Sequence, residues 1–310
     1  MRDVTHKVNT LRTATAVATL RARADTISRI RDGNLPKGDA LTVAKVAGIQ
    51  AAKGTSDLIP YCHPIPIEFA DVRFSFSDDA VEITATVKTI YKTGIEMEAL
   101  TAACIAALTL YDMTKMIDDD VLIEQVKLLE KRGGKSDFPA VPEVGVAIIT
   151  VSDTASSGER EDISGPIAAG VLTEQGATLV DSKIVSDDAD EIEIAVRSFV
   201  KSPSVSLIVL TGGTGAGPRD NTPEAVRRIF DKELPGVAEQ MRRYGQDRTP
   251  FAMLSRSVCG IAGDSVVLCL PGSPKAVEEG LRAVLPHLMH VIAVLGGAGH
   301  DELVAAEDEL

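Results

Sequence analysis

The chain has 310 residues, of which 45% are hydrophobic and 25% charged, and its formal net charge at pH 7 is −13. It contains no apolar run of about 18 residues, which argues against a membrane-spanning helix. The acidic balance also argues against a nucleic-acid partner, because phosphate backbones need a basic surface.

Length and charge distribution together predict two domains. Residues 1–138 carry 18 Lys and Arg against 19 Asp and Glu, whereas residues 139–310 carry 14 against 26. The Gly- and Pro-rich segment at 132–143 is typical of a linker. We therefore expect one domain over residues 1–138 and a second over residues 143–310.

The cysteines and the N-terminal residues indicate the compartment. The four cysteines form no CxxC pair, and the N-terminal segment has no apolar stretch typical of a secretory signal. These features favour reduced thiols in a cytoplasmic protein.

The first half predicts a mixture of helices and strands. Ala-rich segments favour helices, and alternation of apolar and polar residues favours antiparallel strands. We expect an α+β domain in which helices pack on an antiparallel sheet, with a ferredoxin-like arrangement. In chain order, the expected elements are helices over residues 14–32 and 41–53, a strand pair over 69–77 and 80–92, a helix that begins after Gly94, and a strand near 121–129.

The helix after Gly94 sets four ionisable side chains into an apolar background: Glu96, Glu98, Asp112 and Lys115. At ~100° per residue, Glu98 and Asp112 fall within ~40° of the same face, and Lys115 can contact Asp112. Ionisable groups on a buried helix are costly unless they are paired, so they are usually paired or functional. Two interpretations follow: a structural Asp–Lys pair with the glutamates near the positive helix N-terminus, or catalytic groups.

Loops of the first half hold further candidates, each with a plain structural alternative. Tyr61, Cys62 and His63 lie in a loop stiffened by prolines, without further ligands at zinc spacing. Lys37 lies in a turn, where a solvated loop charge is common. Residues 133–136 look like the end of a phosphate loop, but Leu129 stands where a P-loop requires Gly.

Together these segments resemble the MoaC family, the cyclic pyranopterin monophosphate synthases of molybdenum cofactor synthesis. The resemblance covers nearly all of residues 1–138. It departs from the family pattern at Tyr61, where Leu is usual, and at Thr114, where Cys is usual. The motifs that carry it are Asp3-Val4, Lys37-Gly38-Asp39, the segments 47–53, 58–64, 92–100 and 111–115, and Gly133-Gly134-Lys135-Ser136.

The resemblance implies an enzyme that converts (8S)-3',8-cyclo-7,8-dihydroguanosine 5'-triphosphate, a cyclised GTP derivative, to cyclic pyranopterin monophosphate and diphosphate. Lys37 and Lys115 would donate or accept protons and contact phosphates, and Asp112 would position Lys115. A lysine desolvated in a pocket has a lowered pKa and can act near neutral pH. The other implied substrate contacts are Tyr61, Cys62, His63, Glu96, Met97 and Glu98, with Lys135 on the path of the triphosphate. A domain that only binds a nucleotide is the alternative.

The second half alternates strands and helices. Continuous Val and Ile strands joined by helices predict a three-layer α/β domain with a mostly parallel sheet, in which ligands gather at the carboxyl ends of the strands. The residues beyond 296 form an acidic tail that we expect to be loose. The expected strands span residues 144–151, 178–185, 207–211 and 266–270, and the expected helices 163–175, 190–200, 223–231 and 275–295, the last broken near Pro286.

Two glycine turns follow predicted strands of this half. Glycines at a strand's carboxyl end allow backbone amides to surround an anion. Asp220 and either Asp187 or Asp188 could reach the same edge, and two carboxylates with phosphate oxygens suit Mg²⁺. The candidate pterin- and nucleotide-binding residues are Thr211, Gly212, Gly213, Thr214, Gly215 and Ser273.

Over residues 143–300 this half resembles the MoaB/MogA family of molybdopterin-binding proteins. The carrying motifs are Val151-Ser152-Asp153, the segments 211–215, 217–220 and 222–225, and Pro271-Gly272-Ser273-Pro274-Lys275. The resemblance implies that molybdopterin is adenylylated by ATP with Mg²⁺ and no tightly bound organic cofactor. Asp187 and Asp220 would be metal ligands or would orient the pterin phosphate, although Asp188 could replace Asp187.

The two resemblances imply a bifunctional enzyme of molybdenum cofactor synthesis. A second half that binds pterin or supports assembly without turnover is the alternative. Both families typically form oligomers with threefold symmetry, so we expect a homo-oligomer such as a trimer or hexamer. His287 and His290 lie one turn apart without further ligands, and we expect them to be packing or surface residues.

Overall fold

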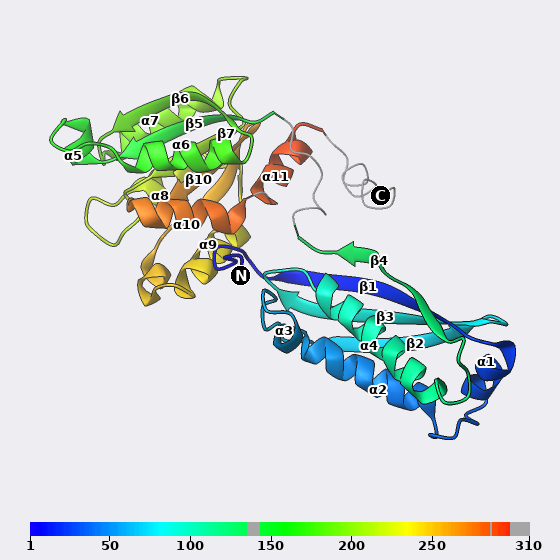
Figure 1. The fold of residues 1–310 in the computed structure, drawn as a ribbon. Coiled ribbons are helices and arrows are strands. Elements are labelled where there is room, and N and C mark those ends of the chain that lie inside the picture. The colour runs from blue at the N-terminus through cyan, green and yellow to red at the C-terminus, as the bar shows by residue number, and fades with distance from the viewer. Residues whose placement is uncertain (135–142, 286, 298–310) are drawn as a thin grey trace. The chain divides into compact units, whose positions relative to one another are not determined.

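The computed structural model describes residues 1–134, 143–285 and 287–297. The chain divides into two compact units, Met1–Phe138 and Pro139–Leu310 (Figure 1). None of the described helices has the length and apolar character needed to cross a membrane. Lys135, Pro286, most of the expected linker and the tail from residue 298 lie outside the described residues.

The first unit is an antiparallel sheet with helices on one face, as predicted (Figure 1). Helices α2 and α4 pack side by side over strands β1 and β3 and enclose an Ala-rich core. The strand order is β2-β3-β1-β4. The ferredoxin-like arrangement stays a prediction. The elements are β1 (Thr10–Arg21), α1 (Ala24–Arg31), α2 (Ala40–Lys53), α3 (Thr55–Leu58), β2 (Phe69–Phe76), β3 (Ala80–Tyr91), α4 (Glu96–Thr114) and β4 (Leu122–Arg132).

The helix predicted over residues 14–32 is wrong. The first part of that segment belongs to β1, a central strand paired with β3 on one side and β4 on the other, and only Ala24–Arg31 is helical. Ala16, Ala18 and Leu20 alternate toward the core, which is the period-2 pattern of a strand. Alanine's helix propensity is weak compared with the two hydrogen-bonded ladders and the burial that the sheet provides.

The second unit is a six-stranded sheet between two layers of helices (Figure 1). The strand order is β6-β5-β7-β10-β9-β8, in which the first four strands are parallel, β9 is antiparallel to β10, and β8 is antiparallel to β9. Helices α6 and α10 cover one face, and α7 and α8 cover the other. The strands are β5 (Gly145–Val151), β6 (Thr178–Val185), β7 (Leu207–Thr211), β8 (Lys232–Glu233), β9 (Cys259–Ala262) and β10 (Ser265–Leu270). The helices are α5 (Asp153–Ser156), α6 (Ser164–Glu174), α7 (Ala189–Val200), α8 (Thr222–Arg227), α9 (Pro235–Gln246), the short 3₁₀ helix η2 (Pro250–Leu254), α10 (Pro274–Val284) and α11 (His287–Leu295).

The sequence prediction missed the short helix α5 and most of the segment between residues 232 and 262. That segment contains β8, α9, η2 and β9. Strands β8 and β9 are too short for a clear alternation, and α9 carries many polar residues because one of its faces is exposed. This segment matters because α9 and η2 form one wall of the cavity described below.

Candidate functional site

Lys37, Asp112 and Lys115 form an exposed charge cluster at the C-terminal end of α4. The Nζ atoms of Lys37 and Lys115 each lie 2.8 Å from an Asp112 carboxylate oxygen. Their hydrogen bonds, that from Lys115 being the stronger influence, lower the pKa of Asp112 to about 2, and Asp112 in turn raises the pKa of Lys115. The side chains of Lys37, Asp112 and Lys115 are 37%, 57% and 55% exposed. The expectation of a desolvated lysine with a lowered pKa is therefore wrong for the single chain.

Glu98 lies at the opposite end of the same helix in a different environment. Only 3% of Glu98 is exposed, and this burial raises the pKa of its carboxyl to about 7. Cys62 lies close enough for the charge of Glu98 to add to burial in raising the pKa of the thiol. In the same loop, a ring nitrogen of His63 lies 3.0 Å from the backbone oxygen of Arg2. Tyr61, which precedes Cys62, and Met97, which precedes Glu98, are both exposed.

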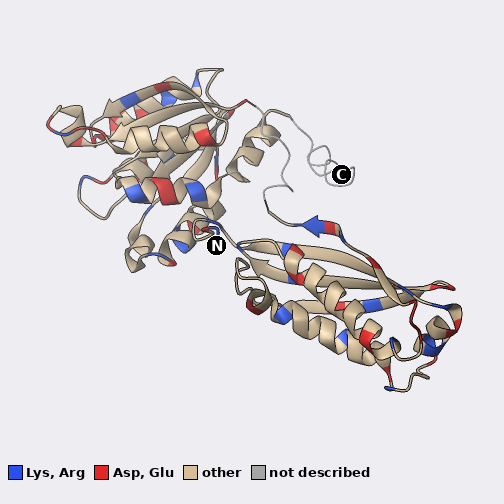
Figure 2. Cartoon of the chain, viewed as in Figure 1, with Lys and Arg blue, Asp and Glu red and all other residues tan. Residues whose placement is uncertain are grey.

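The predicted first-half site residues are therefore brought together in two groups rather than one. Asp112 follows Glu98 by 14 positions in the helix, which corresponds to about 21 Å along the axis. The helix between them carries no charge, so that its acidic side chains lie at its two ends (Figure 2). We call the groups the lysine cluster (Lys37, Asp112, Lys115) and the glutamate end (Cys62, His63, Glu96, Met97, Glu98).

A small basic cavity of about 200 Å³ adjoins the glutamate end. It is lined by Arg12, Lys131 and Arg132 together with Glu96, whose carboxylate lies 3.4 Å from the Nζ of Lys131. Sequence reasoning missed these three cations, although two of them directly precede the Gly133-Gly134 motif. The predicted phosphate contact Lys135 lies outside the described residues.

In the second unit, the carboxyl ends of β5, β6, β7 and β10 meet at one edge of the sheet. The two glycine turns touch there, because Gly212 donates a backbone hydrogen bond to the Leu270 oxygen. Gly212 and Gly213 have φ angles of 104° and 61°, a region that side chains other than glycine rarely adopt. A Cβ on Gly272 would also lie only 3.2 Å from the Cα of Gly212. These glycines permit the close approach of the two turns.

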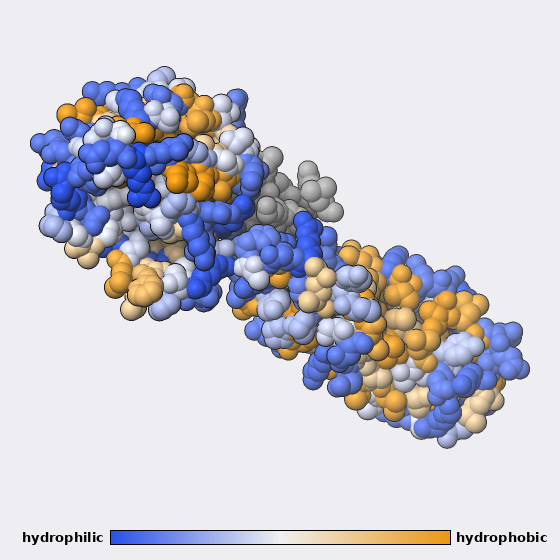
Figure 3. Space-filling view, turned by 60° about the vertical axis from the view of Figure 1, so that its left-hand side comes forward, coloured by the Kyte–Doolittle hydropathy of each residue, from blue (hydrophilic) through white to orange (hydrophobic). Residues whose placement is uncertain are grey.

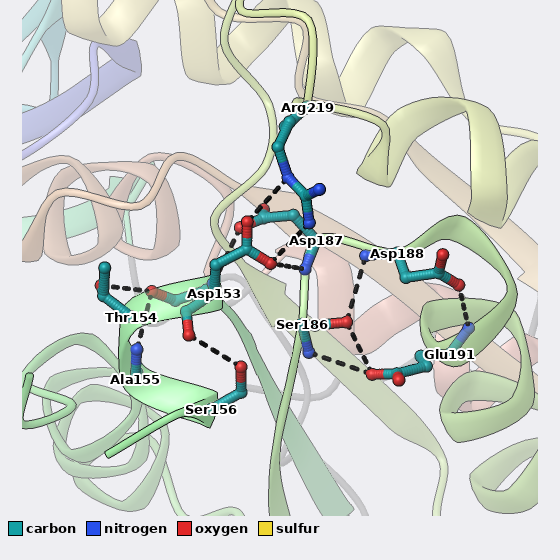
Figure 4. A network of polar contacts seen from close by, with 10 residues as sticks. Asp153, Thr154, Ala155, Ser156, Ser186, Asp187, Asp188, Glu191 and Arg219 are labelled. Carbon is teal, nitrogen blue, oxygen red and sulfur yellow. Dashed lines mark hydrogen bonds and ion pairs between the residues drawn. The ribbon is translucent and has the colours of Figure 1, made fainter. Parts of the chain in front are cut away.

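Asp153, Asp187 and Arg219 form a polar network at this edge (Figure 4). The backbone nitrogen of Asp153 donates to the Asp187 carboxylate at 2.9 Å, and that of Asp187 donates to the Asp153 carboxylate at 3.0 Å. Arg219 holds Asp153 through two contacts of 2.7 Å. Burial raises the pKa of Asp187, whereas the hydrogen bond from the Asp187 backbone lowers the pKa of Asp153.

The neighbouring Asp188 is the N-cap residue of α7. Its carboxylate accepts hydrogen bonds from the backbone nitrogens of Asp190 and Glu191 and so caps the N-terminus of α7 (Figure 4). An N-cap of this kind stabilises a helix by about 1 kcal/mol. This geometry favours Asp187 over Asp188 as the carboxylate that faces a ligand.

Hard oxygen atoms surround Gly213 and fit a Mg²⁺–phosphate group. A Cβ on Gly213 would lie 2.2 Å from the Thr222 hydroxyl and 3.3 Å from an Asp187 carboxylate oxygen. The Thr222 hydroxyl is buried without a hydrogen-bond partner. Among residues 1–134, 143–285 and 287–297, no group of three or more His, Cys, Asp or Glu side chains could hold a metal ion alone. Mg²⁺ usually takes one or two carboxylates plus substrate phosphates, so this donor set suits a metal that arrives with a nucleotide.

A cavity of about 460 Å³ opens beside the glycine turns. Gly213, Asp220 and Ser273 line it at the sheet edge. Phe251 of η2 and Glu279 of α10 also line it. Asp220 is held in place by the backbone nitrogen of Gly217, which donates to it at 2.8 Å. Sequence reasoning missed the cavity residues of η2, which has no recognisable motif, and those of α10 that lie beyond the motif at residues 271–275.

Comparisons with known proteins match the two halves of the chain to different families. The model of the MoaC family matches residues 1–134, and that of the probable molybdopterin binding domain matches residues 147–290. The molybdenum cofactor biosynthesis bifunctional protein of Synechococcus elongatus is 42% identical, covering 97% of this chain and 98% of its own length. The cyclic pyranopterin monophosphate synthase of Novosphingobium aromaticivorans is 52% identical over 136 residues, which are 44% of this chain and 87% of that protein.

A solved structure also resembles the second unit. The molybdopterin biosynthesis enzyme MoaB of Thermus thermophilus is 41% identical, with a TM-score of 0.48, and covers 50% of this chain and 98% of its own. A bifunctional relative matches over nearly the whole length of the chain, and one family model matches in each half. Together these matches show the family. The chain belongs to the bifunctional molybdenum cofactor biosynthesis proteins, in which a MoaC-family half is joined to a half of the probable molybdopterin binding domain family.

Proposed function

We propose that the first half is a cyclic pyranopterin monophosphate synthase that acts on the cyclised GTP derivative and releases diphosphate. The observation that carries this proposal is the pair of charged groups on α4 in a MoaC-family domain. The buried carboxyl of Glu98, with a pKa of about 7, can both accept and donate a proton near neutral pH. Lys37 and Lys115 supply the positive charge that phosphate closure needs. The cations Arg12, Lys131 and Arg132 are placed to hold the triphosphate beside the glutamate end.

One substrate molecule cannot use both groups within a single chain, because they lie about 21 Å apart along α4. Proton transfer requires donor and acceptor within hydrogen-bond reach of the reacting atoms. We infer that a second copy of the chain completes each site. The glutamate end of one copy would then face the lysine cluster of its partner.

An exposed apolar stripe on the helices supports this assembly. On α4, Met97, Leu108 and Tyr111 are 39%, 47% and 38% exposed, and on α2, Val43 and Val46 are 48% and 62% exposed. Apolar residues also gather on the face of the first unit that Figure 3 shows. Contiguous exposed apolar surface on a soluble protein usually marks an interaction site.

A twofold axis explains how the stripe joins the two groups. If the axis crosses α4 midway between Glu98 and Asp112, two α4 helices pack antiparallel, and each Glu98 approaches the partner's Lys115. An interface of this isologous kind repeats every contact twice. Cys104, half-buried on α4 one residue from the midpoint, would lie near its copy. A short bis-maleimide should therefore link two chains through Cys104 in a Cys62→Ser background, and Cys104→Ala should abolish that link.

Mixing two inactive variants tests the composite site directly. Lys115→Met retains Glu98, and Glu98→Gln retains Lys115, so a mixed pair of chains contains one intact site and one doubly impaired site. After unfolding and refolding together, random pairing should restore about one quarter of wild-type diphosphate release. Each variant refolded alone should stay inactive. Activity that is not restored on mixing would show that both groups act from the same chain.

We propose that the second half adenylylates molybdopterin. The terminal phosphate oxygen of the pterin would attack the α-phosphorus of ATP and displace diphosphate. Mg²⁺, when bound, would neutralise the phosphates between Asp187 and Asp220. The described residues contribute by holding the two carboxylates. Arg219 binds the Asp153 carboxylate, the Asp153 backbone nitrogen donates to the Asp187 carboxylate, and the Gly217 amide donates to Asp220.

Incubation with molybdopterin, ATP and Mg²⁺ tests this activity. Adenylylated pterin and diphosphate should form in equal amounts, and Asp220→Asn should reduce their formation by about 10² or more. The alternative, a module that binds or presents pterin, predicts retained pterin binding without ATP consumption.

A further inference from the structure

The cavity beside the glycine turns has two chemically different ends. The end at the sheet edge is formed by Gly213, Gly215 and Ser273, whose backbone and hydroxyl groups suit a phosphate. The far end is formed by residues between 241 and 257, in which Met241 of α9 and the side chains of Phe251 and Leu254 of η2 supply apolar surface beside Arg242 and several hydroxyl side chains. A volume of about 460 Å³ lies in the range of small-molecule sites. This polarity suits a ligand with a phosphate at one end and a ring system at the other.

Helix η2 exposes an unusual amount of apolar surface. Phe251, Met253 and Leu254 are 75%, 61% and 61% exposed, and all three belong to the same five-residue helix. The chain has no Trp and only 4% aromatic residues, so a phenyl ring left in water is notable. Phe251 and Leu254 line the cavity, whereas Met253 does not. The position of Phe251 at the cavity suits contact with the face of a planar ring.

Glu279 supplies the only carboxylate on the α10 wall of the cavity among the described residues. Ala276, Glu279 and Gly280 lie on one face of α10, as the spacing of three and four residues requires. The Glu279 side chain is 20% exposed, and it forms an ion pair with the 81% exposed Lys275, whose Nζ lies 3.9 Å from its carboxylate. A carboxylate offers about four lone-pair sites, so this single long contact leaves Glu279 able to accept hydrogen bonds from a ligand in the cavity.

The ring that Glu279 would prefer follows from the pattern of donors. A pterin presents two adjacent donors on its pyrimidine edge, the N3–H and the 2-amino group, and a carboxylate can accept both at once. Adenine presents one amino donor beside an acceptor nitrogen, which a carboxylate repels. The acid therefore discriminates in favour of the pterin and against the adenine of ATP.

We propose that the far end of this cavity binds the pterin ring of molybdopterin, with Phe251 against the ring face and Glu279 on its amino–lactam edge. The ligand phosphate then points to the glycine turns, where the adenylyl group is transferred. This assignment rests on the proposed pterin-adenylylating function of the second half. It makes Phe251 and Glu279 specificity-determining residues of that site.

Two soluble probes test the proposal without molybdopterin itself. 6-Hydroxymethylpterin carries the amino–lactam edge, whereas lumazine, a pteridine-2,4-dione, has an oxygen in place of the 2-amino group. The wild-type chain should bind the pterin at least tenfold more tightly than lumazine, as followed by ligand fluorescence. Glu279→Gln should weaken pterin binding about tenfold and remove most of that preference. Phe251→Ala should weaken both probes to a similar degree, by about tenfold.

Met253→Ala is the matched control, because Met253 lies on the same helix with similar exposure but outside the cavity. It should leave both affinities unchanged. Unchanged pterin binding in Phe251→Ala and Glu279→Gln would overturn the proposal, as would a loss of AMP affinity in place of pterin affinity. A change of oligomeric mass shared by Phe251→Ala and Met253→Ala, with pterin binding intact, would assign η2 to a subunit interface instead.

The test of the ring site and the test of adenylyl transfer can fail independently of each other. If the pterin probe binds as described but no adenylylated product forms from molybdopterin and ATP, the ring site stands and the adenylyl transfer fails. If product forms and the two variants bind and react as the wild type, the ring site fails and the adenylyl transfer stands.

Discussion

Glu98 and Asp112 show how strongly the surroundings of a carboxylate control its charge. Both lie on α4, yet the pKa of Glu98 is raised to about 7 and that of Asp112 is lowered to about 2. Burial raises the first, since a charge is poorly solvated in the core, and two lysine ammonium groups lower the second. At neutral pH Glu98 can therefore exchange a proton, while Asp112 stays ionised and keeps Lys37 and Lys115 in place.

Glu98 should make the protein less stable as the pH rises. The folded protein holds the Glu98 proton up to about pH 7, whereas the unfolded chain releases it near pH 4.5. The free energy of unfolding therefore falls between these values, by roughly 3 kcal/mol at most, and stays lower at higher pH. Glu98→Gln should remove this dependence and be more stable than the wild type at pH 8, as urea unfolding of both proteins from pH 4.5 to pH 8 would show. Glu96→Gln, two residues away and paired with Lys131, should retain most of the slope, because the charge of Glu96 contributes less than burial to the raised pKa of Glu98. A wild type that gains stability toward pH 8 would contradict the prediction.

Asp112→Asn should affect activity far more than stability. The ion pairs of Asp112 are exposed, and exposed pairs contribute little to folding. Without the carboxylate, both lysines lose the group that fixes their positions, and diphosphate release should fall by about 10² or more. Asp71→Asn removes a comparable contact with Lys45 at 2.7 Å and should leave activity unchanged. A drop in melting temperature large enough to explain the lost activity would argue for the purely structural interpretation.

Among the secondary-structure elements, the contact between α2 and α4 depends on small residues. A Cβ on Gly48 of α2 would lie 2.9 Å from the backbone oxygen of Ala102 and 3.1 Å from a methyl group of Val72. The α4 residues at this contact are alanines, which allow the two helices to lie close together over the sheet. Close packing at this point sets the direction of α4 and hence the positions of both charged groups.

Gly48→Ala should therefore lower stability, although Ala favours helices. Overpacking against a backbone oxygen costs about 1–3 kcal/mol, which exceeds the roughly 1 kcal/mol that Ala gains over Gly inside a helix. Gly170 of α6 is the opposite case, since a Cβ there meets no atom within 4 Å. Gly170→Ala should raise the stability of the second unit by up to about 1 kcal/mol. Calorimetric melting of the two variants would reveal the opposite signs, and equal shifts in one direction would refute the packing argument.

At the scale of the whole molecule, each half has its own core and its own candidate site. The first core lies between the four-stranded sheet and its helices, and the second is formed within the six-stranded unit. A chain divided in this way usually folds as independent units. The two proposed reactions are also not consecutive, so neither half needs the product of the other.

Separation of the chain between Phe138 and Pro139 should leave two folded proteins. Each should melt cooperatively within a few degrees of the corresponding transition of the intact chain, because each unit is compact and has a hydrophobic core of its own. The first should retain diphosphate release and the second pterin adenylylation, each near its rate in the intact chain. Circular dichroism and the two assays measure this, with the intact chain as the control. Loss of one activity that returns when the halves are mixed would instead reveal coupling between them.

The sequence by itself determined the domain classes and most element positions, and it supplied the residues proposed for both candidate sites. Long continuous strands such as β5 and β7 and the helix α4 carry strong local patterns, and the glycine turns and acidic motifs are read directly from the chain. Prediction from the sequence failed where the local conformational preference of a segment and its tertiary contacts disagree. The Ala-rich β1 is a strand because it pairs on both sides, and the short elements between residues 232 and 262 have no pattern of their own.

Only the tertiary structure decided how the predicted site residues are grouped. Position along a sequence indicates which face of α4 a residue occupies, but not whether its neighbours leave it in water, as with Lys115, or bury it, as with Glu98. In the same way, the capping role of Asp188 and the η2 wall of the cavity depend on contacts between distant segments. Periodicity is a local property of the chain, whereas burial, charge state and cavity shape arise from packing between elements, and the chemistry depends on the latter.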